Sequence, residues 1–117
     1  CTGTFPDNMT LENTGNKLVN LTISSNVSGA GFVDATSGQG SLYFAAANSE
    51  VDACSSGLQT SFTNFSAADT NYTLCSNFST VNTNDEIFIM FQVELPADTS
   101  DGTKSATITI VGEDCAQ

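Results

Sequence analysis

Carboxylates and cysteines are the side chains that could do chemistry in this chain of 117 residues, because the chain contains no histidine. Without imidazole, the usual base of a Ser-His or Cys-His nucleophile is missing, and so is the commonest nitrogen ligand of metals. Four of the glutamates could supply the carboxylate pair of a glycosidase: Glu12, Glu50, Glu86 and Glu94. Their spacing selects no two of them. The sequence therefore predicts no catalytic residue, no enzyme and no cofactor.

The acidic residues also offer a weak pattern for calcium. The stretches DTSDG (98–102) and GED (112–114) would bring oxygen ligands to one end of the molecule if strands 87–95 and 104–111 paired as a hairpin. The spacing departs from the Asp-x-Asp-x-Asp-Gly loop, because position 100 is serine. Asp and Gly at these positions also suit an ordinary turn. We expect a turn between Asp98 and Asp101 and no metal site.

The four cysteines are predicted to form two disulfides. No two of them are close enough in sequence for the Cys-x-x-Cys pattern of a zinc site, and disulfides indicate an oxidising compartment. Three connectivities are possible. We favour Cys54–Cys75, which would join two neighbouring loops, and Cys1–Cys115, which would tie the ends of the chain together.

Asn-x-Ser/Thr sequons also predict an extracellular, cell-surface protein that carries N-linked glycans. The chain has more of them than its composition alone would give. They lie at Asn8, Asn20, Asn26, Asn64, Asn71 and Asn77. In KLVNLTI (17–23), alternation places Val19 and Leu21 on one face of a strand and Asn20 on the opposite face, which is expected to be wet.

The net charge of the chain limits the kinds of molecule that it can bind. Thirteen acidic residues stand against Lys17 and Lys104, which gives a net charge of −11. Such a surface repels phosphate backbones and anionic lipids, so we expect no binding to nucleic acid or to membrane surfaces. The sequence also contains no apolar run of the length that spans a membrane.

The composition favours strands joined by turns, since it is rich in Thr, Ser, Asn and Gly and poor in helix formers. Alternating apolar residues predict short strands about ten residues apart and no amphipathic helix. The predicted strands are 8–13, 17–25, 32–36, 41–47, 58–65, 71–78, 86–96 and 104–113. A loop is predicted at 48–57. The predicted fold is all-β, an immunoglobulin-like antiparallel β-sandwich of about seven or eight strands over residues 8–117.

The strongest of these strands, 86–96, is apolar on both faces. One face consists of Ile87, Ile89, Phe91, Val93 and Leu95. Phe88 and Met90 make part of the other face apolar too, although a two-layer sandwich buries only one face of each strand. Either a loop folded across them or a neighbouring subunit is expected to cover these two side chains.

Two stretches resemble the secreted immunoglobulin-like modules of archaeal and bacterial surfaces. MTLENTGNKLVNLTI (9–23) resembles their opening pair of strands, and VELPADTSDGTKSATITI (93–110) resembles their closing hairpin. Among such modules, the camelysin-type fibre proteins have a similar strand–Asn-x-Gly–strand start; they include biofilm-matrix fibres and archaeal bundling pili. The resemblance implies the sandwich fold and head-to-tail assembly into fibres.

A departure from this pattern lies at the N-terminal end. Complete modules of this kind have an extra strand before the one that leads into the Asn-Thr-Gly turn, whereas this chain offers only CTGTFPD, in which Gly3 and Pro6 break strands. Either the sandwich starts late, or belongs to a longer chain, or one sheet lacks a strand that the next subunit supplies. In the last case residues 1–7 are the candidate donor segment, with Thr4 and Phe5 at its centre.

These observations predict a structural subunit of an extracellular, N-glycosylated filament, a homopolymer assembled by β-strand complementation. The alternative is a carbohydrate- or protein-binding module of a larger secreted surface protein. Sugar-binding sandwiches offer flat aromatic platforms, and this chain has no Trp and only two Tyr, Tyr43 and Tyr72, which favours the filament.

Overall fold

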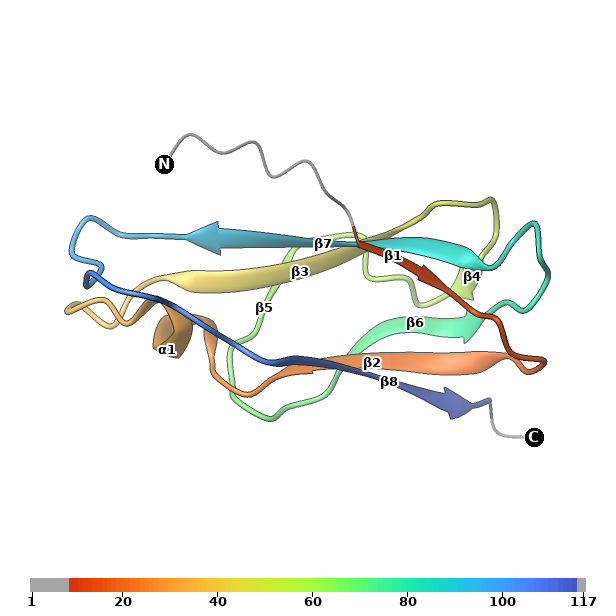
Figure 1. The fold of residues 1–117 in the computed structure, drawn as a ribbon, viewed down its shortest axis with the longest axis horizontal. Helices are drawn as coiled ribbons and strands as arrows, with labels where there is room; N and C mark the ends of the chain where they lie inside the picture. The colour runs from red at the N-terminus through yellow and green to blue at the C-terminus, as the bar shows by residue number, and fades with distance from the viewer. Residues whose placement is uncertain (1–8, 116–117) are drawn as a thin grey trace.

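The computed structural model describes residues 9–115 and confirms an all-β sandwich of two four-stranded antiparallel sheets (Figure 1). The first sheet has the order β1 (Met9–Glu12), β7 (Glu86–Glu94), β3 (Ser41–Asn48), β5 (Thr63–Asn64). The second has the order β4 (Cys54–Ser56), β6 (Tyr72–Phe78), β2 (Val19–Ser25), β8 (Ile108–Asp114). The described residues also include one short helix, α1 (Gly29–Val33), which lies between β2 and β3 in the chain.

The Asn-Thr-Gly-Asn turn forms a corner between the two sheets, because β1 and β2 lie in different sheets. Asn13 holds this corner with its side chain. Its Nδ2 donates to the carbonyls of Lys17 and Phe78, both at 3.1 Å, and its Oδ1 accepts from the N–H of Gly15 at 3.0 Å. Such side-chain bonds to nearby backbone are the reason that Asn is favoured in turns.

Strands 87–95 and 104–111 do not pair as the hairpin that the calcium pattern required and that the resemblance of 93–110 implied. β7 pairs with β1 and β3 in the first sheet, whereas β8 pairs with β2 in the second. The segment between them crosses from one sheet to the other (Figure 1). Alternation within each strand predicted two strands correctly, but it carries no information about which strands become neighbours.

The core lies between the sheets and is centred on a cluster of aromatic rings. Phe44 of β3 lies 4.8 Å from Phe65 and 5.7 Å from Tyr72 of β6, measured between ring centroids. Ile23 of β2 and Ile87 of β7 are completely buried in the same core. Aromatic pairs at these separations add to the free energy of burial.

Three local predictions differ from the structure. Residues 32–36 were expected to form a strand, but the chain forms α1, whose first turn is capped by Ser28 Oγ accepting from the N–H of Gly31 at 3.0 Å. Gly29 lets the helix approach β3 closely, since a Cβ there would lie 2.5 Å from the backbone nitrogen of Leu42. Residues 54–56, expected in a loop, form β4, and the predicted strand 58–65 is reduced to β5.

Among residues 9–115, no helix has both the length and the apolar character needed to cross a membrane.

Candidate functional site

One edge of the first sheet is only half covered. β1 pairs with β7 from Glu86 to Ile89, where Met9 lies opposite Ile89, but β7 continues to Glu94. On its other side, β7 pairs with β3 along nearly its whole length. Past Ile89, no strand of the described residues pairs with the outer edge of β7. An edge of this kind presents backbone N–H and C=O groups for pairing with another segment.

The inner face of β7 is exposed along the same stretch. Ile89 is completely buried, but Phe91 is 40% exposed and Val93 42% exposed. Both lie opposite buried residues of β3, namely Phe44 and Leu42, so they belong to the face that points into the sandwich. The prediction that one face of 86–96 would be buried throughout is therefore right only for its first half.

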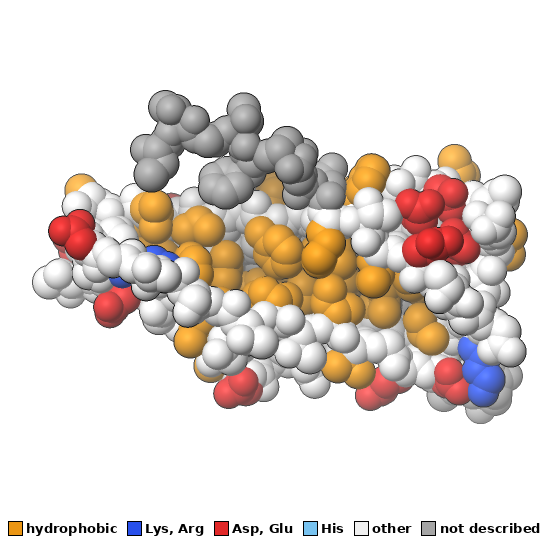
Figure 2. All heavy atoms as spheres, viewed as in Figure 1, with side chains coloured by type: hydrophobic (Ala, Val, Ile, Leu, Met, Phe, Trp, Pro, Cys, Tyr) orange, Lys and Arg blue, Asp and Glu red, His pale blue; other side chains and the backbone are white. Residues whose placement is uncertain are grey.

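The exposed face continues into a groove between the two sheets. Figure 2 shows a band of apolar side chains on this side of the molecule, between the edge formed by β1 and β7 and the edge formed by β8. Near the end of β1 the surface is hollowed by about 290 Å³. The apolar residues that line this hollow are Leu11, Val19, Leu21, Phe78 and Ile110. We call the hollow, together with exposed Phe91, Val93 and Leu95, the edge groove.

Phe88 and Met90 lie on the opposite, outer face of β7 and are half-buried. Their cross-strand neighbours on β3 are the small residues Ala47 and Ala45. That a neighbouring subunit covers them stays a prediction. Thr4 and Phe5, the centre of the candidate donor segment 1–7, lie outside the described residues.

The disulfide Cys54–Cys75 is confirmed, with 6.0 Å between the two Cα atoms. It joins the adjacent strands β4 and β6, of which β4 lies in the stretch 48–57 that was expected to be a loop. The second predicted pair, Cys1–Cys115, stays a prediction because Cys1 lies outside the described residues.

The sequons differ in how open their side chains are. Asn20, Asn26 and Asn71 are exposed, Asn77 is half-buried, and Asn8 lies outside the described residues. Asn64 is half-buried, and its Oδ1 is buried without a hydrogen-bond partner. The expected wet face at Asn20 is thus present.

The turn with Asp98 and Asp101 gathers no cluster of carboxylates with residues 112–114. Both carboxylate oxygens of Asp98 accept hydrogen bonds from Ser37, from its N–H at 2.7 Å and from its Oγ at 3.1 Å. Asp114 lies on β8 and forms an ion pair with Lys17 at 2.9 Å. Asp98 and Asp114 thus have different partners, and the two stretches 98–102 and 112–114 do not form one group of ligands.

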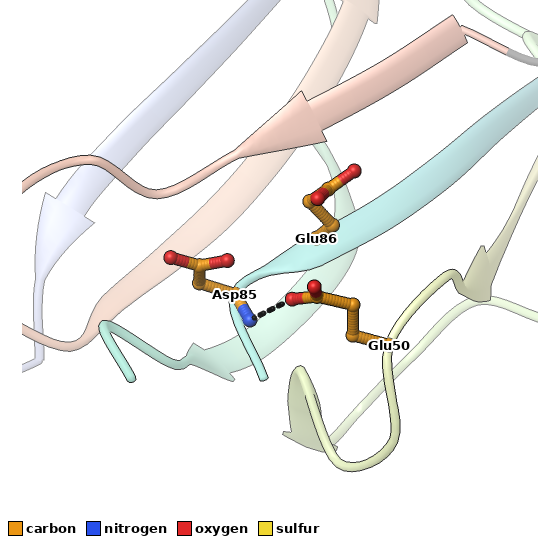
Figure 3. A group of neighbouring side chains, drawn as sticks. All are labelled: Glu50, Asp85 and Glu86. Carbon is orange, nitrogen blue, oxygen red and sulfur yellow. Dashed lines mark hydrogen bonds between the residues drawn. The ribbon is translucent and has the colours of Figure 1, made fainter. Parts of the chain in front are cut away.

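A different acidic cluster lies where β7 begins (Figure 3). Glu50, Asp85 and Glu86 each place a carboxylate oxygen within 4.8 Å of the others. Glu12 of β1 is the cross-strand neighbour of Glu86. Three of these four residues were candidates in the sequence for a carboxylate pair, but their spacing offered no reason to bring them together. Topology does so, because the loop after β3 folds against the start of β7 (Figure 1).

The cluster changes the acidity of its members. Burial raises the pKa of Asp85 above its ordinary value of 3.8, and contact with the carboxyl group of Glu50 and the charge of Glu12 raise it further. Burial and the charges of Glu50, Glu12 and Asp85 raise the pKa of Glu86 in the same way. Both effects disfavour the charged form of a carboxyl group.

Comparison of the chain with protein-family models, with curated proteins and with solved structures finds no match.

Proposed function

We propose that this chain is a structural subunit of an extracellular filament, and that each copy inserts its N-terminal segment into the edge groove of the next copy. The observation that carries the proposal is the second half of β7, where a strand edge that no other strand within residues 9–115 pairs with and an exposed inner apolar face occur on the same residues. A strand from another copy would satisfy both at once, by β-augmentation.

Only a few side chains would contribute to the free energy of this contact between subunits. Covering the exposed parts of Phe91, Val93 and Leu95 would contribute about 1 kcal/mol for each side chain. Backbone pairing along Met90–Glu94 would add hydrogen bonds that each contribute about 1 kcal/mol. The hollow beside Leu11 and Ile110 offers room for a further apolar side chain of the donor, and we assign Phe5 to that role.

The polarity of this contact determines the kind of assembly. The donor segment, residues 1–7, and the acceptor groove are different surfaces of the chain, so the contact is head-to-tail. Contacts of this type propagate into an open filament unless their rotation closes a ring. The resemblance of 9–23 to the opening of camelysin-type fibre proteins supports the same mode, and the sequons and the disulfide support an extracellular, glycosylated product.

Electron microscopy of purified protein tests the proposal with three variants. Deleting residues 1–7 should leave folded monomers that form no filaments. Replacing Phe91 and Val93 by Ser should also stop assembly, because it makes the groove polar. Phe62→Ser is the matched control, since Phe62 is 46% exposed and lies before β5, at the far edge of the same sheet. This variant should assemble like the parent.

Another occupant of the groove gives a different result. If residues 1–8 of the same chain lie along β7 and extend β1, the full-length protein is monomeric and the deletion lowers its melting temperature. Monomeric full-length protein, or filaments after the deletion, would therefore overturn the proposal. Phe88→Ser and Met90→Ser should weaken contacts between subunits; loss of monomer stability with normal assembly would instead assign both side chains to the subunit itself.

A further inference from the structure

The acidic cluster holds more negative charge than its surroundings compensate. Glu50, Asp85 and Glu86 come within 4.8 Å of one another, and Glu12 faces Glu86 across the β1–β7 pair. Figure 2 shows acidic side chains gathered at this end of the first sheet. Like charges directly opposite each other on neighbouring strands are destabilising. The two lysines of the chain are engaged elsewhere, since Lys17 Nζ pairs with Asp114 and Lys104 Nζ donates to Ser100.

A second observation concerns one buried oxygen atom. The side chain of Asp85 is only 4% exposed, and its Oδ1 is buried with no hydrogen-bond partner. Buried polar atoms of folded proteins nearly always form a hydrogen bond, and an atom that does not is explained by a water molecule, an ion or a functional role. Asp85 also belongs to a group of three neighbouring carboxyl groups, and for such a group a cation is the partner of matching chemistry.

The backbone holds the cluster together despite its repulsion. The carbonyl of Glu86 accepts from the N–H groups of Ser49 and Glu50, both at 3.1 Å. The N–H of Asp85 donates to Glu50 Oε2 at 2.9 Å, which leaves the other oxygen of that carboxylate available (Figure 3). On the opposite side, the N–H of Asn13 donates to the carbonyl of Asp85 at 2.9 Å. These bonds hold the backbones of the three residues next to one another and hold the Glu50 carboxylate against Asp85.

We propose that Glu50, Asp85 and Glu86 bind a calcium ion, with Glu12 as a further nearby charge. Carboxylate oxygens are the ligands of hard cations, and the described residues of the cluster offer neither the nitrogen nor the sulfur ligands that zinc prefers. Calcium accepts irregular sets of oxygen ligands that water completes, whereas magnesium demands an octahedron and gives up its water reluctantly. None of the three proposed ligands lines the edge groove, although Glu12 and Asn13 beside them do, and the calcium site is argued from observations other than those behind the proposed function.

Titration of the chelator-treated, full-length protein with calcium chloride tests the site by calorimetry. We expect a dissociation constant of about 10⁻⁴ to 10⁻³ M, the range of extracellular calcium modules, and a melting temperature that rises with calcium. Asp85→Asn and Glu86→Gln should each weaken binding about tenfold or more. Asp101→Asn is the matched control; it removes a carboxylate of the 98–102 turn and should leave the affinity unchanged.

Magnesium chloride at equal ionic strength separates binding from charge screening. Equal shifts of the melting temperature with both salts, unaltered in Glu86→Gln, would overturn the proposal and assign the effect to screening. The absence of any calcium response in the parent protein would also overturn it, and would leave a proton shared by Glu50 and Asp85 as the means by which the cluster is stabilised. Glu86→Gln keeps the test decisive if Asp85→Asn fails to fold, since Glu86 is only half-buried.

Discussion

At the scale of single residues, Asp85 predicts how stability depends on pH in the absence of metal. Its raised pKa means that folding favours the protonated carboxyl group, so its contribution to stability is greatest below its ordinary value of 3.8 and is lost as the pH rises through the pKa of the folded state. The neutral amide of an asparagine in its place would resemble the protonated acid. In a chelator, Asp85→Asn should therefore melt at a higher temperature than the parent at a pH of about 7, and the two should converge toward about pH 4.

Circular dichroism at several pH values measures this difference. Glu12, Glu50 and Glu86 are present in both proteins, so the difference between the two melting temperatures reports Asp85 together with the effect of its charge on the pKa of Glu86. A difference that stays constant with pH would show that Asp85 is already neutral, or already compensated, at every pH in the range.

The sequons give a second prediction at this scale. In Asn20 and Asn26 the Oδ1 accepts a backbone N–H, from Asn77 at 3.1 Å and from Thr107 at 2.8 Å, and Nδ2, the atom to which a glycan is attached, is left available. Asn71 is exposed. We expect glycans at these three asparagines in protein from its native source, as measured by mass spectrometry of its peptides.

Two other sequons serve as internal controls for the same spectra. Asn64 has a buried Oδ1 at the place where α1 comes closest, since a Cβ on Gly29 would lie 2.4 Å from it. The Nδ2 of Asn77 donates to Ser56 Oγ at 3.1 Å. Both should be unmodified, and a fully occupied Asn64 would contradict the link between burial and occupancy.

Contacts between individual side chains could be predicted from the sequence only where each residue has few possible partners. With four cysteines, three connectivities exist, and the favoured pair Cys54–Cys75 is correct. The cluster of Glu50, Asp85 and Glu86 could not be found in this way, because Glu50 lies in the loop after β3 whereas Asp85 and Glu86 lie at the start of β7. These two places meet only through the order of the strands. Thirteen acidic residues can be grouped in too many ways for a cluster to be selected from the sequence. The only local spacing that suggested a metal site was that of residues 98–102.

At the scale of elements, the disulfide makes a prediction about β4. This strand has three residues and lies at the edge of the second sheet, so its pairing with β6 alone holds it weakly. Replacing Cys54 and Cys75 by Ser removes a cross-link with a sequence separation of 21 and should lower the free energy of unfolding by about 3 kcal/mol. Unfolding in urea measures the loss. Ser55→Ala in the same strand is the control, and a loss below about 1 kcal/mol would mean that backbone pairing suffices.

Strands were predicted best where one face is buried and the other is wet. The ranges 8–13, 17–25, 41–47, 71–78 and 86–96 correspond to β1, β2, β3, β6 and β7. The prediction of a strand at 32–36 was wrong, because a short apolar run fits a strand and a buried helix equally well. The side chain of Ser28 caps the first turn of α1 and thereby favours the helix. Within residues 9–115, β1 pairs with β7 only as far as Ile89, and alternation within β7 does not contain that information.

At the scale of the whole molecule, charge opposes the proposed assembly. Each copy carries −11 and measures about 47 × 30 × 20 Å, so neighbouring copies in a filament bring their charges within a few tens of ångströms. The Debye length is about 30 Å in 10 mM salt and about 10 Å in 100 mM salt, so repulsion between whole subunits is screened only at the higher concentration. Insertion of a donor segment into the edge groove is mainly apolar and does not depend on this screening.

Filament growth should therefore become about tenfold faster when sodium chloride is raised from about 10 mM to about 150 mM, as followed by light scattering. The double variant Asp101→Asn, Glu113→Gln has a net charge of about −9, since two of the thirteen acids are removed, and both positions are exposed. Its growth should be faster at low salt and less dependent on salt. Growth that slows with added salt would mean that attraction between opposite charges drives the contact, which is incompatible with an apolar groove as the acceptor.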